Sequence, residues 1–188
     1  MAKIGFSLFT EMLEEAVSAI KDGRVPSIDL DSSKTVELNL RIPALIPETY
    51  LPDVHLRLMF YKRISALQSN DGLRDLQVEM IDRLGLHPDP LKLLFRLTQL
   101  RFRAQACGIK KLDAGSINGY IQFCPDTKID PQLLVSLIQK APMQFKFGEA
   151  NQLRFVHQRE APEDKLNFMN GLLDELQPKE LERPDGDK

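Results

Sequence analysis

The stretch "GIKKLDAGSINGYIQFC" (residues 108–124) is where this 188-residue chain changes from a helical to a strand pattern. Two short apolar runs flank a glycine-containing turn, which predicts two antiparallel strands, with residues 120–124 the stronger. The stretch follows a long helical pattern that Gly108 brings to an end. Helices therefore come in one block before a strand pair, which argues against alternating βαβ units.

Upstream of this stretch, apolar spacing predicts four helices and one strand. The first helix covers residues 5–22 and carries one apolar stripe, and residues 24–34 read as a linker. "TVELNLRI" (residues 35–42) alternates apolar and polar residues, as a half-buried strand does. Helices are then predicted at about 54–69 behind an Asp53 cap, at about 73–84 ending at Gly85, and from Pro90 behind an Asp89 cap.

Downstream, a helix of about ten residues is predicted to start at Asp130-Pro131. "MQFKF" and "LRFVH" (residues 143–147 and 153–157) are predicted to form a hairpin, and Pro162 to open a last amphipathic helix. The polar end of the chain is expected to be disordered. Helices and hairpins in separate blocks predict an α+β fold, with a helical subregion packed against short antiparallel strands.

The composition places the chain among ordinary globular proteins. It is 43% hydrophobic and 28% charged, and its formal net charge of -2 does not suggest a basic nucleic-acid binder. Two cysteines without ligand spacing indicate neither a disulfide scaffold nor a zinc site. No apolar run has the length of a membrane span. We therefore expect a cytoplasmic protein that makes no membrane contact.

The sequence lacks the motifs of catalysis and cofactor binding. It has neither a GxxxxGK[ST] phosphate loop nor a GxGxxG fingerprint, and it has no GxSxG nucleophile motif. Its three histidines have no metal-ligand spacing, and its adjacent carboxylates fall on predicted helix surfaces. We therefore predict no catalytic, cofactor-binding or metal-binding residues, and expect the chain to act through contact with another protein.

Two charged segments are candidates for such contact. Residues 92–111 hold six basic and no acidic side chains, so this segment either contacts phosphates or an acidic partner, or is a helix surface balanced by the acidic C-terminal quarter of the chain. In "VEMIDRLGLHPDP" (residues 78–90), Glu79, Asp82 and Arg83 point away from the apolar stripe of their helix. They are either a solvated helix face with an i,i+4 pair or a surface for a partner.

Specific segments resemble the family of bacterial transcription-repair coupling factors. They are "LPDVHLRLMFYKRISA" and "VEMIDRLGLHPDP", supported by "GFSLFTEMLEEAV", "VELNLRIPALIP", "GIKKLD" and "LRFVHQ". The likeness covers nearly all of residues 4–176. Leu84 and His87 depart from it, because the family pattern has a Phe and an apolar residue there. That departure concerns the packing of the turn and not the charged face.

The resemblance implies a function. The full family protein is an ATP-dependent DNA translocase that uses ATP and Mg, displaces stalled RNA polymerase from DNA and recruits the repair protein UvrA. This chain looks like the part after the motor: residues 1–34 a last motor helix and linker, 35–177 a regulatory domain, and 178–188 a tail. That domain is expected to need no cofactor, to have no enzyme activity, and to mask the UvrA-binding domain of the same protein. Glu79, Asp82 and Arg83 are the expected masking contact; the alternative is a nucleic-acid-contacting appendage that uses residues 92–111.

Overall fold

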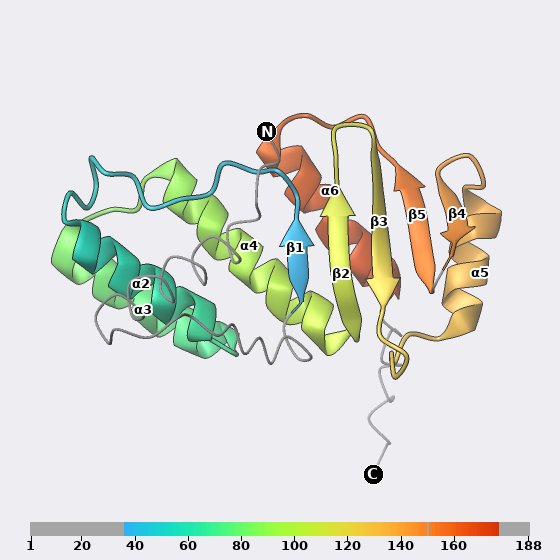
Figure 1. Cartoon of the computed structure of the whole chain (residues 1–188), viewed down its shortest axis with the longest axis horizontal. Helices are drawn as coiled ribbons and strands as arrows, with labels where there is room; N and C mark the ends of the chain where they lie inside the picture. The colour runs from blue at the N-terminus through green and yellow to red at the C-terminus, as the bar shows by residue number, and fades with distance from the viewer. Residues whose placement is uncertain (1–35, 150, 177–188) are drawn as a thin grey trace, which may run out of the picture.

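The computed structural model describes residues 36–149 and 151–176 (Figure 1). The predicted helix at 5–22, the linker and the tail lie outside these residues. In chain order the elements are β1 (Glu37–Asn39), α2 (Val54–Ala66), α3 (Asn70–Leu84), α4 (Asp89–Ala106), β2 (Ile109–Ala114), β3 (Asn118–Phe123), α5 (Pro131–Lys140), β4 (Phe145–Gly148), β5 (Gln152–Val156) and α6 (Pro162–Leu176).

The strands form one mixed sheet in the order β1-β2-β3-β5-β4. The two predicted hairpins, β2–β3 and β4–β5, are present and antiparallel, and β3 joins them by pairing with β5. β1 alone is parallel to its neighbour, β2. A parallel pair needs a long crossover connection, and here α2, α3 and α4 supply it. The predicted α+β class is confirmed.

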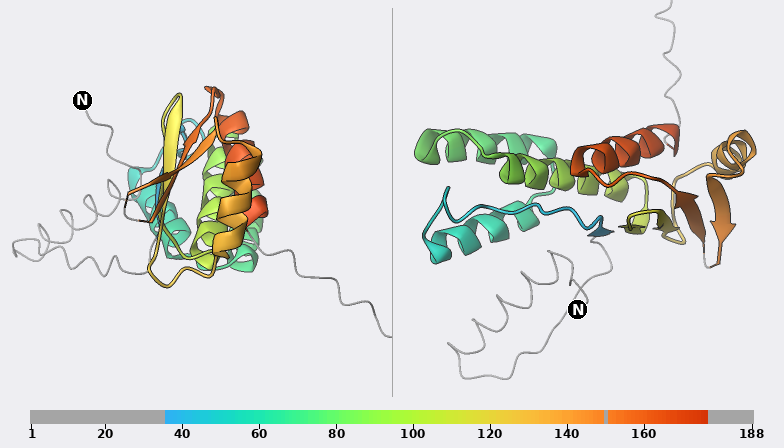
Figure 2. Two further views of the ribbon diagram at one scale, coloured as in Figure 1. Left: turned by 90° about the vertical axis from the view of Figure 1, so that its right-hand side faces the viewer. Right: turned by 90° about the horizontal axis from the view of Figure 1, so that it is seen from above.

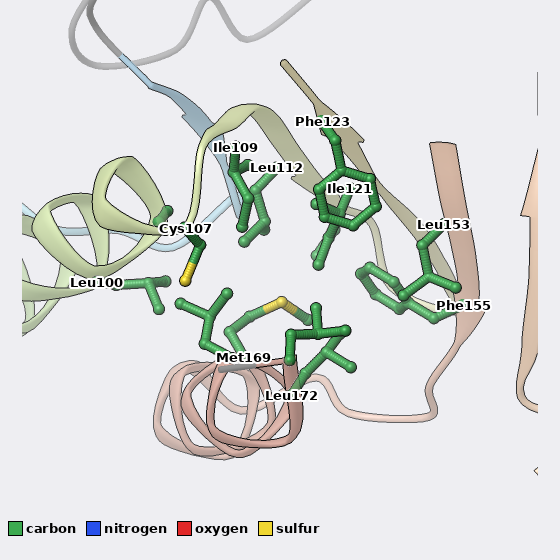
Figure 3. Packing of buried hydrophobic residues seen from close by; sticks show 14 of the residues in the cluster. Leu100, Cys107, Ile109, Leu112, Ile121, Phe123, Leu153, Phe155, Met169 and Leu172 are labelled. Carbon is green, nitrogen blue, oxygen red and sulfur yellow. The ribbon is translucent and has the colours of Figure 1, made fainter. Parts of the chain in front are cut away.

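Helices α4 and α6 cover one face of the sheet, and α2 and α3 lie beyond β1 at one end of the molecule (Figures 1 and 2). The inward side chains of β2, β3 and β5 meet the apolar faces of α4 and α6 in a first core (Figure 3). Its fully buried members include Leu100, Leu112, Ile121, Leu153 and Met169. Polar residues, half-buried or exposed, alternate with these on β2 and β3, so the opposite face of the sheet is polar among the described residues.

A second core holds α2 and α3 against the first half of α4. It includes Phe60 of α2, Met80 of α3 and Phe95 of α4, all almost completely buried. Leu93 and Leu97 of α4 pack against both cores. α4 is therefore the element that fixes the position of the α2–α3 pair relative to the sheet.

Several predicted boundaries were wrong for local reasons. The strand predicted at 35–42 shortens to β1, and Arg41 beyond it has a left-handed backbone with φ 54°. α3 begins three residues earlier than predicted because the Ser69 hydroxyl accepts from the Gly72 N–H at 3.2 Å. Asp89 is the first residue of α4 and not its cap, and its carboxylate bonds to Lys92 instead.

Candidate partner-binding surface

The predicted charged residues lie on α3 where it packs against α2. The helices are joined by residues 67–69, so they run side by side in opposite directions. Apolar residues at helical spacing hold them together: Phe60 and Ile64 on α2, and Leu76 and Met80 on α3. Asp53 fixes the start of α2 by accepting from the Leu56 N–H at 2.9 Å. The surface above this contact is therefore built on two well-anchored helices.

Glu79 is held by two arginines rather than projecting alone. Arg63 of α2 donates from Nη1 to Glu79 Oε1 at 2.8 Å and from Nη2 to Oε2 at 2.5 Å. Arg83, one turn later on α3, donates to Oε1 at 3.0 Å. The two guanidinium groups lie 5.5 and 5.9 Å from the ring centre of Phe60. The Arg63–Glu79–Arg83 cluster thus closes the groove between α2 and α3 over a buried aromatic ring.

This geometry changes the acidity of Glu79. The bidentate hydrogen bonds from Arg63, and then those from Arg83, lower the pKa of the Glu79 carboxyl from 4.5 to about 2. The same contact raises the pKa of the Arg63 guanidinium. The carboxylate is one-third exposed, so water screens the pair. Glu79 stays ionised throughout the physiological range, and the cluster carries a net positive charge.

Asp82 and its neighbours complete the surface. Asp82 is exposed and makes no hydrogen bond or ion pair with any residue in the described part of the chain. Val78, one turn before Asp82 on the same side of α3, is 53% exposed, whereas Ile81, 40% exposed, lies on the flank opposite Glu79 and Arg83. Met80, rather than Ile81, takes the buried position against α2. Exposed aliphatic groups beside fixed and free charges are typical of a surface that binds a protein.

Of the three predicted contact residues, the structure brings Glu79 and Arg83 together and leaves Asp82 free. The interhelical partner Arg63 was not predicted to belong to the site. Helical spacing on α2 predicts only that Arg63 faces outward. Its pairing with Glu79 depends on how α2 and α3 pack, which neither helix determines alone. A basic residue one turn after a buried Phe60 was the only local signal.

The basic segment 92–111 is largely engaged within the molecule. Arg96 contacts Glu163 and Asn167 of α6, and Arg103 contacts Asn170 and Asp174. Arg101 donates to the carbonyls of residues 64, 65 and 67, which closes the end of α2. Lys111 pairs with Glu37 at 2.7 Å. Acidic side chains therefore neutralise much of this segment, two of them from α6, as expected for a balanced helix surface.

The other titratable groups have structural positions. His87 packs edge-on against Phe95, and His157 lies buried between Phe155 and Phe168. Burial lowers the pKa of both histidines. Cys107 and Cys124 form no disulfide. Within residues 36–149 and 151–176, no three His, Cys, Asp or Glu side chains are grouped as metal ligands.

A polar pocket lies between α3, α4 and α6. Its lining consists of arginine and amide side chains: Asn70, Arg74, Gln77, Arg96, Gln99, Arg103 and Asn170. Arginine stays protonated at physiological pH, and amides do not exchange protons, so this pocket offers no general acid or base. Nor does any helix in the described part of the chain have the length and apolar character needed to cross a membrane.

Comparison with known proteins identifies the family. Residues 40–134 match the family model described as the TRCF domain. The chain is 38% identical over 177 residues to the transcription-repair-coupling factor of Escherichia coli (strain K12), an alignment that covers 94% of the chain and 15% of the relative. It is 40% identical over 170 residues to that of Haemophilus influenzae, covering 90% and 15%.

A solved structure described as the C-terminal domain of transcription-repair coupling factor superimposes with a TM-score of 0.60 at 23% identity. The superposition covers 76% of this chain and 94% of that one, and at this identity it supports the fold alone. The chain spans about 15% of the length of the two relatives named above. From the family match and the relatives together, the chain belongs to the transcription-repair-coupling factor family.

Proposed function

We propose that this chain is a C-terminal regulatory domain that masks the UvrA-binding domain of its own longer protein. The observation that supports this best is the α2–α3 surface, where the Arg63–Glu79–Arg83 cluster lies beside the exposed Val78 and beside Asp82, which has no partner among the described residues. Fixed charges beside a small apolar area suit a contact that must form specifically and also be released.

In this proposal the three charged residues have different tasks. Asp82 is the side chain with bonding capacity left for a partner cation. Arg83 has one terminal nitrogen committed to Glu79 and is half exposed, so it can also meet a partner acid. Glu79 mainly fixes the two arginines, and through them the shape of the surface. Val78 supplies apolar area that the partner covers.

The rest of the proposal concerns the longer protein. We infer that it is a cytoplasmic ATP-dependent DNA translocase that displaces stalled RNA polymerase and recruits UvrA. ATP, Mg and DNA belong to its motor, and this domain works without a cofactor or catalytic residues. The family match supports the assignment, and the absence of catalytic motifs from the sequence agrees with a regulatory role.

The test is a titration of this chain with the isolated UvrA-binding domain of the same protein. Asp82→Lys is the sharpest variant, because Asp82 loses no partner within residues 36–149 and 151–176. We expect the variant to fold normally and to bind about tenfold more weakly or worse, since one attractive contact becomes a repulsive one. In the full-length protein the same change should increase UvrA binding.

The matched control changes two acids and one base elsewhere: Asp164→Ala, Glu175→Ala and Lys140→Ala, all exposed. The triple change Glu79→Ala, Asp82→Ala and Arg83→Ala should weaken binding to the UvrA-binding domain. The control triple change should leave that binding unchanged. Equal affinity of Asp82→Lys and the unmodified chain for the UvrA-binding domain would reject the assignment of this surface.

The alternative is a nucleic-acid contact through residues 92–111. Lys110 is exposed, and Arg96 and Arg103 line the polar pocket, but their guanidinium groups already bond to α6. A phosphate binder loses affinity steeply as salt increases. Tight, salt-sensitive DNA binding by this chain, together with no binding to the UvrA-binding domain, would favour the alternative.

A further inference from the structure

The end of the molecule formed by β4 and α5 has three features that the proposed function does not use. β4 is an edge strand, α5 is an apolar helix that leaves Val135 exposed beyond its contacts with the first core, and Lys146 and Arg154 face each other without an ion pair to any described residue. This end is on the far side of the sheet from α2 and α3 (Figure 1). Together these features describe a site for an added strand.

The backbone of β4 has bonding capacity on its outer side. β5 is its partner in the sheet, and Val156 N–H donates to Gln144 C=O at 2.9 Å. Bonded and non-bonded pairs alternate along an antiparallel ladder, so Phe145 and Phe147 direct their backbone groups away from β5. The Phe145 N–H is taken by the Ala141 carbonyl. The Phe145 C=O and both groups of Phe147 remain for another strand.

α5 extends the helical layer beyond the sheet. It lies on the side of the sheet that α6 covers, but farther out than β4 (Figures 1 and 2). Leu137 is fully buried and Leu134 and Ile138 pack against the first core, but Val135 is 42% exposed. Phe147 and Met143 nearby are 60% and 88% exposed. A sixth strand beside β4 would lie beneath α5 and cover part of this apolar surface.

The open face at the same edge is positively charged. Lys146 and Arg154 are directly opposite each other on β4 and β5. Both are exposed, and neither forms an ion pair with the residues described. The Arg154 side chain lies across β4, with Nε 3.1 Å from where a Cβ on Gly148 would be. Like charges in direct opposition destabilise a strand pair unless acids come between or beside them.

We propose that the outer edge of β4 receives an extended segment of a partner protein as a sixth strand, with apolar and acidic side chains in alternation. Successive side chains of a strand point to opposite faces. One set would pack against Phe147 and α5, and the other would place carboxylates beside Lys146 and Arg154. The backbone of the segment would bond to Phe145 and Phe147, the mode of peptide binding called β-augmentation.

The charges also select among occupants. A second copy of this chain paired through β4 would bring Lys146 and Arg154 against their own equivalents, which repels. A nucleic-acid strand has no amide ladder to pair with the backbone of Phe147. An acidic, extended protein segment satisfies the backbone, the apolar and the charged features together. This site does not depend on the masking proposal, and either can fail without the other.

The test uses the pentapeptide acetyl-Glu-Val-Glu-Val-Glu-amide as a probe, with acetyl-Lys-Val-Lys-Val-Lys-amide as its charge-reversed control. Amide NMR shifts are followed across the whole chain at millimolar peptide. We expect shifts at residues 143–148, slower hydrogen exchange of the Phe147 amide, and about tenfold weaker binding of the lysine peptide. α3 should show no change.

The double variant Lys146→Glu with Arg154→Glu makes the experiment decisive. Both residues are exposed, so the fold should persist, and the preference should reverse toward the lysine peptide. No shift at residues 143–148 with either peptide would overturn the proposal, as would equal affinity for both. A dimer that is seen by sedimentation and abolished by Phe147→Asp would also overturn it. So would an oligothymidylate that shifts the amides of residues 143–148 when the peptide does not.

Discussion

At the scale of single residues, the functional surface depends on which charges have partners. Glu79 is the centre of a three-residue contact, whereas Asp82 forms no hydrogen bond or ion pair with the described residues, although the two are three residues apart on one helix. A paired charge mostly shapes the surface, whereas an unpaired one can bind. Mutational effects at the two positions should therefore differ in kind: Glu79 affects stability, and Asp82 affects binding.

Glu79→Gln should make the pH dependence of stability shallower. The folded pKa of about 2 is below the ordinary value of 4.5, so ionised Glu79 favours the folded state above pH 4.5. That contribution is lost as the pH falls from 4.5 toward 2. The free energy of unfolding, measured with urea at a series of pH values, should differ between Glu79→Gln and the unmodified chain at pH 6 and converge near pH 2. A difference that grows on acidification would contradict this assignment.

Arg101 joins two helices through backbone carbonyls rather than through an acid. Arg101→Met keeps the aliphatic stem but removes the donors to residues 64, 65 and 67, so we expect a loss of about 1–3 kcal/mol in the free energy of unfolding. Lys140→Met is the control, because Lys140 is exposed and forms no ion pair with any residue that the structure describes, and it should change stability by less than about 0.5 kcal/mol. Equal effects of the two changes in urea unfolding would show that the carbonyl contacts contribute nothing.

At the scale of the elements, the centre of the sheet depends on a glycine opposite an aromatic residue. Gly119 of β3 pairs with Phe155 of β5, whose ring lies over it. A Cβ on Gly119 would be 2.2 Å from Phe155 Cζ and 2.5 Å from the Asp113 carbonyl oxygen. Neither the ring nor the backbone has room to move, because Phe155 is 2% exposed in the core between the sheet and α6.

Gly119→Ala should therefore destabilise the protein by about 1–3 kcal/mol or more, the cost of overpacking a core. Gly171→Ala is the matched control on α6, where an added Cβ meets no atom within 4 Å. Alanine favours a helix over glycine, so this change should stabilise the protein by about 0.5–1 kcal/mol. Thermal unfolding of both variants measures the two opposite shifts. A stable Gly119→Ala would mean that Phe155 does not occupy the position described.

At the scale of the whole molecule, the two cores share α4. Helices α2 and α3, which are 13 and 15 residues long, pack on the first half of α4. The second half of α4 packs on the sheet. Leu93 and Leu97 touch both cores. We therefore expect the partner-binding surface to unfold together with the sheet and not as a separate unit.

Phe60→Ala tests this coupling. Removing a ring that is 1% exposed should cost about 3–5 kcal/mol. If the molecule unfolds as one unit, hydrogen exchange should accelerate at the amide of Ile121 in the sheet as much as at that of Met80 in α3. Val54→Ala, a change at an exposed residue on the same helix, is the control and should leave both amides unchanged. Acceleration confined to α2 and α3 would show two independent units.

The sequence by itself determined the elements. Hydrophobic spacing located α2 to α6 and both hairpins, and Gly85 and Gly108 end α3 and α4 with positive φ as the pattern predicts. Such signals are local, because they depend on residues within one or two turns. The same is true of the motifs that resemble the family, which the family match now confirms for residues 40–134.

Only the tertiary structure decided which charges are free. Arg63 and Glu79 are 16 residues apart and Arg96 and Glu163 are 67 apart, so no spacing rule pairs them. Contacts within the folded chain occupy most of the basic side chains of residues 92–111. Asp82, Lys146 and Arg154 have no such partners in the described residues. Charge is written in the sequence, but whether a charge is neutralised depends on which elements pack side by side, and that is a property of the folded chain.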